Sequence, residues 1–193
     1  MNKKQLAIKL SKLEQLKEHN QKLEQYTTPS ETAASILWQA YMNNDIEGKI
    51  IADFGCGSGI LGKGALLLGA RKAYFIDIDK EAIKTAKNNA KEGIFINKNI
   101  LLFNEKVDTI IQNPPFGTIN KHIDQQFLIK AFKISNNIYS IHKTSTKPFL
   151  EKLARKNNFK VQTSDFLFRI PNILEKHRKK AVFIETSLFI FKQ

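Results

Sequence analysis

The chain has 193 residues, of which 42% are hydrophobic and 25% charged, a composition that is ordinary for a folded domain and excludes the disordered and fibrous classes. Its 31 basic residues outnumber the 18 acidic ones, and the net charge of +13 predicts a polyanionic partner such as nucleic acid. The single cysteine, Cys56, excludes internal disulfides and a cysteine-rich zinc site; no metal site is predicted, no apolar run is long enough to span a membrane, and we expect a cytoplasmic protein.

The first 48 residues predict two helices. Leucines at roughly helical spacing among Lys, Gln and Glu indicate an amphipathic helix over residues 3–24. Pro29 and Ser30 then supply turn and N-cap residues for an apolar helix over residues 32–42, which Gly48 closes.

From residue 49 onward, short β-branched runs alternate with helical ones. We predict strands at 49–55, 72–79, 93–96, 107–113, 136–143, 159–170 and 179–192, and helices at 58–70, 80–92, 124–135 and 146–158. The alternation is typical of a parallel sheet with crossover helices, whereas the short connection 171–180 favours an antiparallel last pair. The prediction is one α/β domain over residues 1–193, with a seven-stranded, mostly parallel sheet that has one antiparallel strand, plus an N-terminal helix.

A glycine-rich turn follows the first predicted strand. The sequence DFGCGSG places glycines at 55, 57 and 59, where positive φ and close approach of a ligand to the backbone are allowed. Ile60 stands where the dinucleotide fingerprint has its third glycine, so the turn departs from that pattern. Asp77 ends the second strand and can accept hydrogen bonds from both hydroxyls of a ribose, so we predict a nucleoside site.

The sequence NPPF, residues 113–116, follows the fourth predicted strand at the edge where open α/β sheets bind ligands. Asn113 offers a side-chain acceptor and Pro114 a carbonyl to an exocyclic amine, which favours a pyramidal, nucleophilic nitrogen. Pro114 and Pro115 have fixed φ values that stiffen this segment, and Phe116 can stack on a base. The alternative is a turn that simply ends the strand.

These two motifs resemble those of class I methyltransferases. The resemblance implies a three-layer, Rossmann-like class I methyltransferase fold with S-adenosyl-L-methionine as cofactor. It places Asp53 at the methionine end, Gly55, Gly57 and Ser58 against the cofactor, and Asp77 on the ribose. NPPF is similar to the motif of amino-methyltransferases that act on adenine N6, cytosine N4 or the glutamine side chain.

Several further stretches resemble one family, the archaeal and eukaryotic adenine-N6 methyltransferases of small-subunit ribosomal RNA (methyltransferase-like protein five). The matching stretches are LEQYTTP, ADFGCGSGILGKGALLLGA, FIDID, VDTIIQNPPFGT, YSIHKTS and KHRKK. The resemblance implies that residues 1–30 form an N-terminal helix and a cofactor-capping segment, in which Gln25 and Thr28 cover the cofactor. Alignment by the following EKVDTII places Asn99, with Asn97 as the alternative position, where family members usually carry the Asp that binds the adenine amine, and an Asn side-chain oxygen can accept the same bond.

The same resemblance implies an RNA partner and a small zinc-containing activator protein that pairs with the edge strand 93–96. We expect phosphate contacts from basic residues at two chain segments: His142, Lys143, Arg178, Lys179 and Lys180. Three other functions remain open: a protein-glutamine N5-methyltransferase, a DNA adenine-N6 methyltransferase and a non-catalytic RNA-binding module.

Overall fold

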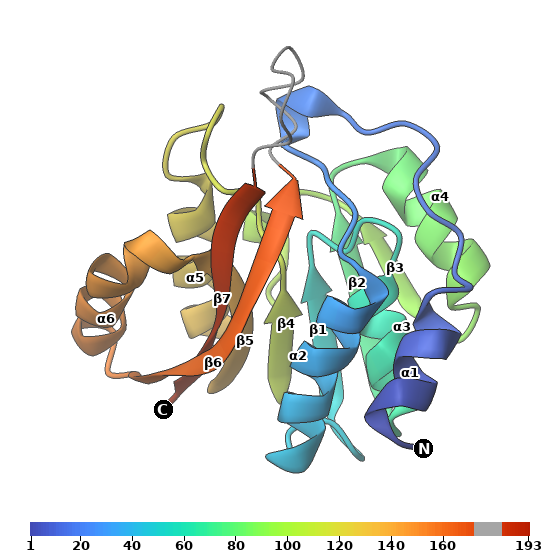
Figure 1. Cartoon of the computed structure of the whole chain (residues 1–193), viewed down its shortest axis with the longest axis horizontal. Coiled ribbons are helices and arrows are strands. Elements are labelled where there is room, and N and C mark those ends of the chain that lie inside the picture. The colour runs from blue at the N-terminus through green and yellow to red at the C-terminus, as the bar shows by residue number, and fades with distance from the viewer. Residues whose placement is uncertain (172–182) are drawn as a thin grey trace.

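Seven strands form one sheet in the order β3-β2-β1-β4-β5-β7-β6 (Figure 1). The structure, a computed structural model, describes residues 1–171 and 183–193, with side chains described for 1–164 and 185–193. The strands are β1 Ile50–Phe54, β2 Lys72–Asp77, β3 Ile94–Asn97, β4 Thr109–Gln112, β5 Asn137–Lys143, β6 Lys160–Pro171 and β7 Phe183–Lys192. β7 runs antiparallel to both of its neighbours, and the other pairs are parallel. The predicted sheet with one reversed strand is confirmed.

Helices cover both faces of the sheet and give the predicted three layers (Figure 1). The described helices are α1 Lys3–Leu10, α2 Ser30–Met42, α3 Ile60–Leu67, α4 Lys80–Asn89, α5 Ile123–Ile134 and α6 Lys147–Lys156, with 3-10 turns η1 Gln21–Leu23, η2 Ile100–Leu102 and η3 Thr144–Thr146. α1 to α4 pack in one apolar core, and η2, α5 and α6 pack in the other. In the described part of the chain, no helix has the length and apolar character needed to cross a membrane.

Covering both faces explains the nearly continuous apolar strands. Along β1, Ile51 enters the core under α1 to α4, whereas Ala52 and Phe54 enter the core under α5 and α6. A strand buried on both faces has no polar face to alternate with the apolar one. β3 lies at the end of the strand order, so its prediction as an edge strand is confirmed.

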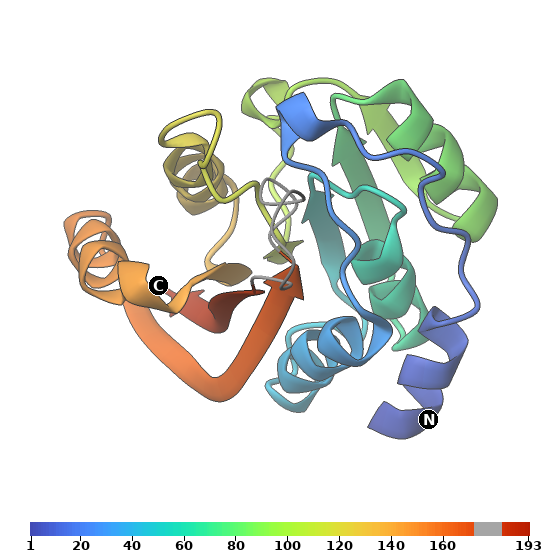
Figure 2. The same ribbon diagram turned by 45° about the horizontal axis from the view of Figure 1, so that its top comes forward.

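The predicted helix over residues 3–24 is wrong beyond Leu10. Ser11 ends α1, and residues 11–29, which we call the N-terminal arm, cross the carboxyl ends of the central strands (Figures 1 and 2). The Asn89 side chain accepts a hydrogen bond from the Glu14 amide and donates one to the Glu14 carbonyl, both 2.9 Å long. Helix periodicity in the sequence cannot show such tertiary bonds, which satisfy the backbone outside a helix.

The start of α2 also differs from the prediction. Ser30 is the first helical residue and Pro29 holds the N-cap position, so Ser30 does not cap the helix. The fixed φ of proline suits the residue that leads into a helix.

Candidate active site

The glycine turn between β1 and α3 has the backbone shape that its composition predicts. Gly55, Gly57 and Gly59 have φ of 67°, 53° and 80°. The amides of Gly55 and Cys56 both donate to the carbonyl of Ile76, which ties the turn to β2. A Cβ added at Gly57 would meet no atom within 4 Å, so the backbone of the turn faces open space that a ligand can fill.

Two buried carboxylates lie beside this turn, at the carboxyl ends of β1 and β2. Asp53 Oδ2 accepts a 2.8 Å hydrogen bond from the Gly62 amide, whereas its Oδ1 is buried and has no partner among the described residues. Burial raises the pKa of Asp53 to about 7, and the nearby charge of Asp77 adds to the effect. Buried acceptors without a donor are rare in folded proteins, so this oxygen is an unusual feature of the site.

Asp77 is already bonded to the backbone. Its Oδ2 accepts from the Gly57 amide at 2.9 Å, and its Oδ1 accepts from the Asp79 amide at 2.9 Å. Burial raises the pKa of this carboxyl as well. Each carboxylate oxygen can accept a second hydrogen bond, so Asp77 retains capacity for hydroxyl donors.

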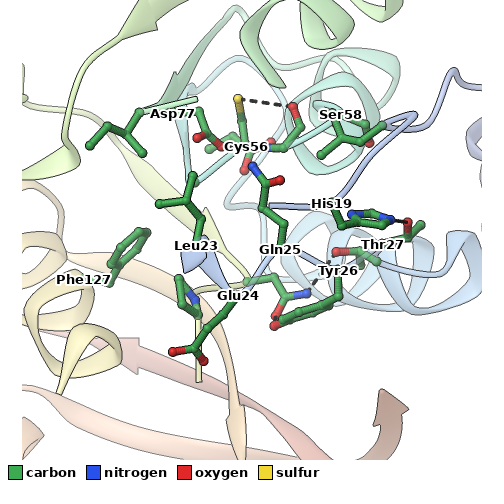
Figure 3. Close-up of a pocket in the computed structure, with 18 of the residues that line it drawn as sticks. His19, Leu23, Glu24, Gln25, Tyr26, Thr27, Cys56, Ser58, Asp77 and Phe127 are labelled. Atoms are coloured by element: carbon green, nitrogen blue, oxygen red, sulfur yellow. Dashed lines mark hydrogen bonds between the residues drawn. The ribbon is translucent and has the colours of Figure 1, made fainter. Parts of the chain in front are cut away.

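A single cavity joins the glycine turn, the end of β4 and the N-terminal arm (Figure 3). Ile78, Ile100 and Phe127 form apolar walls. All the residues predicted to bind the cofactor line this cavity: Gln25, Thr28, Asp53, Gly55, Gly57, Ser58, Asp77 and Asn99. Asn97, the competing position for Asn99, instead donates its side-chain amide to the carbonyls of Asp77 and Ile78.

The N-terminal arm forms the roof of the cavity. Figure 3 shows Gln25 pointing toward the glycine turn, and its Nε2 donates a 2.7 Å hydrogen bond to Asp79. Glu24, which has a left-handed φ of 52°, turns the other way. Its carboxylate accepts hydrogen bonds from the backbone amides of residues 118, 119 and 120 and from the Thr118 hydroxyl. Burial alone would raise the pKa of Glu24, but these bonds lower it below its usual value, so Glu24 is a charged anchor for the arm.

NPPF begins directly after β4 and meets the arm. Asn113 Nδ2 donates a 2.9 Å hydrogen bond to Thr28 Oγ1, which fixes the orientation of the amide. The Tyr26 hydroxyl lies 2.6 Å from Asn113 Oδ1 and 3.2 Å from the Pro114 carbonyl. Burial raises the pKa of Tyr26 well above its usual value, so the hydroxyl keeps its proton and donates. The two acceptors therefore converge on one donor position.

Aromatic stacking completes this position. The rings of Tyr26 and Phe116 are stacked, with centroids 5.1 Å apart and an interplanar angle of 23°. Phe116 is buried in the core under α1 to α4, so its ring is held by its surroundings.

The expected RNA contacts have mixed outcomes. The prediction for His142 is wrong, because both faces of β5 are covered and the ring is buried against Phe189. Burial lowers its pKa to about 3, so the ring is uncharged, and with 1% of its surface exposed it cannot reach a phosphate. Lys143 is partly exposed at the end of β5 and borders a surface hollow. Arg178, Lys179 and Lys180 lie outside the described residues.

Glu24, Tyr26 and Phe127 are among the residues that line the cavity without having been predicted from the sequence. Glu24 and Tyr26 lie within the stretch LEQYTTP, whose resemblance drew attention only to Gln25 and Thr28. Phe127 belongs to α5 and carried no signal beyond an apolar helix position. Cys56 is buried, and burial raises the pKa of its thiol, so it is not a reactive thiolate.

Known proteins are similar to this chain both in the segment that forms the site and over nearly its whole length. The family model for ribosomal protein L11 methyltransferase (PrmA) matches residues 27–126. The rRNA N6-adenosine-methyltransferase METTL5 of Danio rerio is 34% identical, over 99% of this chain and 99% of that protein. An uncharacterized protein of Methanocaldococcus jannaschii is 37% identical over 98% of this chain and 93% of its own. Among solved structures, a candidate RNA methyltransferase of Pyrococcus horikoshii has a TM-score of 0.91 at 40% identity and covers 100% of this chain and 98% of its own.

Proposed function

Because this chain belongs to the family of rRNA N6-adenosine methyltransferases that includes METTL5, we propose that it methylates N6 of an adenosine in small-subunit ribosomal RNA, using S-adenosyl-L-methionine. One observation carries the proposal. The Tyr26 hydroxyl marks one donor position that both Asn113 Oδ1 and the Pro114 carbonyl can reach, and Tyr26 and Asn113 line the same cavity as the glycine turn and Asp53. An amino group has two hydrogens and can satisfy both acceptors at once.

The residues of the glycine turn suit this cofactor. Asp53 Oδ1, which has no hydrogen-bond partner in the described part of the chain, would accept from the α-ammonium group of the methionine end. The open backbone at Gly57 leaves room for the ligand. Asp77 would accept from the ribose hydroxyls, and Asn99 from the adenine amine. Asn99 Oδ1 bonds the Leu101 amide at 2.9 Å and retains a second lone pair. When bound, the cofactor supplies a methyl group attached to a positively charged sulfur.

Asn113 and Pro114 prepare the nitrogen for attack. Hydrogen bonds from the N6 amine to both acceptors would favour a pyramidal nitrogen and free its lone pair. The cofactor would supply the methyl group to this nitrogen and keep the electron pair of the bond to sulfur that it gives up. A proton of N6 is then released to water. Catalysis is mainly positioning, with Phe116 stacked on the base.

The net charge and the exposed edge of the sheet indicate which macromolecules the protein binds. The net charge of +13 supports a polyanionic substrate, with Lys143, Arg178, Lys179 and Lys180 as phosphate contacts. β3 is an edge strand on which Ile94 is 37% exposed, and we place an activator protein there by strand addition. We also propose that the protein acts in the cytoplasm.

The test is transfer of a labelled methyl group. The protein, with and without a candidate activator, is incubated with labelled cofactor and separate pools of small-subunit ribosomal RNA, genomic DNA, ribosomal proteins and release factor. We expect N6-methyladenosine in the ribosomal RNA pool and none with Asn113→Ala. Label only in a protein pool would refute the RNA assignment, and label only in DNA would move the target to DNA.

A further inference from the structure

Tyr26 makes the contacts that the proposed mechanism assigns to the target adenine. Its hydroxyl donates to Asn113 Oδ1, lies within reach of the Pro114 carbonyl, and its ring stacks on Phe116. The proposed mechanism assigns the same three contacts to adenine: a hydrogen bond from its amine to Asn113, a second one to the Pro114 carbonyl, and stacking on Phe116. The chain's own side chain therefore fills the position of the substrate base.

The adenine cannot be added beside Tyr26 in this arrangement. Aromatic carbons in contact are about 3.5 to 4 Å apart, so a base inserted between two rings needs a spacing of roughly 7 Å. The rings of Tyr26 and Phe116 are 5.1 Å apart at their centroids. Asn113 Oδ1 is also engaged by the Tyr26 hydroxyl at 2.6 Å. The base must displace the side chain.

Hydrogen bonds on both sides of Tyr26 hold it in place. On one side, Glu24 is anchored by the amides of residues 118–120. On the other side, Thr28 accepts from Asn113, and Gln25 holds Asp79. These bonds fix the backbone of the arm. The smallest motion that frees Asn113 and Phe116 for a base is therefore a rotation of the Tyr26 side chain alone.

We propose that Tyr26 is an internal competitor of the target adenine, so that RNA binds productively only when its base displaces the Tyr26 side chain. This inference rests on the proposed function. Displacement requires a base that replaces both the stacking and the donated hydrogen bonds. Adenine offers an amine to Asn113 and Pro114, whereas guanine offers a carbonyl at the corresponding edge, which would face two other acceptors. Displacement of Tyr26 thus favours a base with an amine, rather than a carbonyl, at the edge that faces Asn113 and Pro114.

The first test is Tyr26→Phe, which keeps the ring and removes the hydroxyl. The loss of one hydrogen bond from the competitor should lower KM for RNA by roughly 2- to 10-fold, because a net bond contributes about that factor, with kcat retained. The matched control is Tyr41→Phe, on α2 and outside the cavity, which should leave both constants unchanged. A fall in kcat at constant KM would overturn the proposal, since it would make Tyr26 a positioning residue for Asn113. Unchanged constants would overturn it as well.

The second test observes displacement directly. The four tyrosines, Tyr26, Tyr41, Tyr74 and Tyr139, are labelled with 3-fluorotyrosine, and Tyr26→Phe assigns its fluorine resonance. A short RNA that the enzyme methylates should shift the Tyr26 signal, and the same RNA with guanosine at the target should not. A Tyr26 signal that stays fixed while the methylated RNA saturates the protein would refute this inference alone. Absence of methyl transfer to any RNA would instead refute the proposed function.

Discussion

Replacing Asp53 by Asn should stabilise the free protein and weaken cofactor binding. Burial raises the pKa of this carboxyl from 3.8 to about 7. At about 1.4 kcal/mol for each pH unit, the ionised carboxylate is less favourable in the folded chain by about 4 kcal/mol. Asp53→Asn removes that cost, and its amide oxygen still accepts from the Gly62 amide.

The pH dependence of this gain in stability follows from proton linkage. A carboxyl whose pKa is raised on folding carries no penalty below about pH 3.8, where it is protonated in both states. The penalty grows as the pH rises and is complete above about pH 7. The free energy of unfolding of Asp53→Asn should therefore exceed that of the unmodified protein by an amount that increases from pH 4 to pH 7 and then levels off.

Urea unfolding at pH 5, 6, 7 and 8 measures this difference. Asp108→Asn is the matched control, because Asp108 is exposed and accepts from the Ile50 amide at the other end of β1. Its stability difference should not follow the same pH course. A gain for Asp53→Asn that is independent of pH, or a loss at pH 8, would show that the carboxylate has a partner in the folded chain and would refute the reasoning.

Asp53→Asn should weaken cofactor binding although it stabilises the free protein. An ammonium group favours the ionised form of Asp53, so binding should release protons at pH 6.5 and tighten between pH 6 and pH 8. Loss of one charge-assisted hydrogen bond in Asp53→Asn should weaken binding by roughly 10- to 100-fold. Calorimetry in buffers of different ionisation enthalpy measures both effects, and affinity that is equal for the two proteins would contradict them.

Three further predictions address other parts of the structure. Asn113→Ala should abolish methyl transfer while cofactor affinity stays within a few-fold, and parallel loss of both would make Asn113 structural. Gly62→Ala should destabilise the fold by roughly 1–3 kcal/mol, because the new Cβ would lie 2.4 Å from Phe75 Cε1; urea unfolding checks this, and a neutral result would mean that Phe75 moves freely. Lys143→Ala should weaken RNA binding and reduce the salt slope by about 1, measured by titration at several salt concentrations; an unchanged slope would remove Lys143 from the phosphate contacts.

Much of the cavity was predictable because its motifs follow strands directly. The three glycines, Asp53 and Asp77 sit at the carboxyl ends of neighbouring parallel strands, which meet at one edge of the sheet. NPPF follows β4 directly, and β4 pairs with β1 on the side opposite to β2. Short-range pattern plus the rule for parallel sheets is enough to bring these residues together.

Burial of polar residues was less predictable. His142 lies near the end of the predicted strand 136–143, where we expected it to be exposed, but β5 lies between β4 and β7 and the ring is buried. Only the position of the strand within the sheet decides whether its polar residues reach solvent.

The order of strands and helices along the chain, the reversed last pair and the two motifs were predictable, because they depend on periodicity and on residues adjacent in the chain. The end of α1 and the path of the arm across the cavity, with Glu24 bonded to residues 118–120 and Tyr26 to Asn113, became visible only in three dimensions. These bonds join residues that lie 87 and 95 positions apart. No local pattern encodes them, since their energy exists only once the sheet has brought both segments to the same edge.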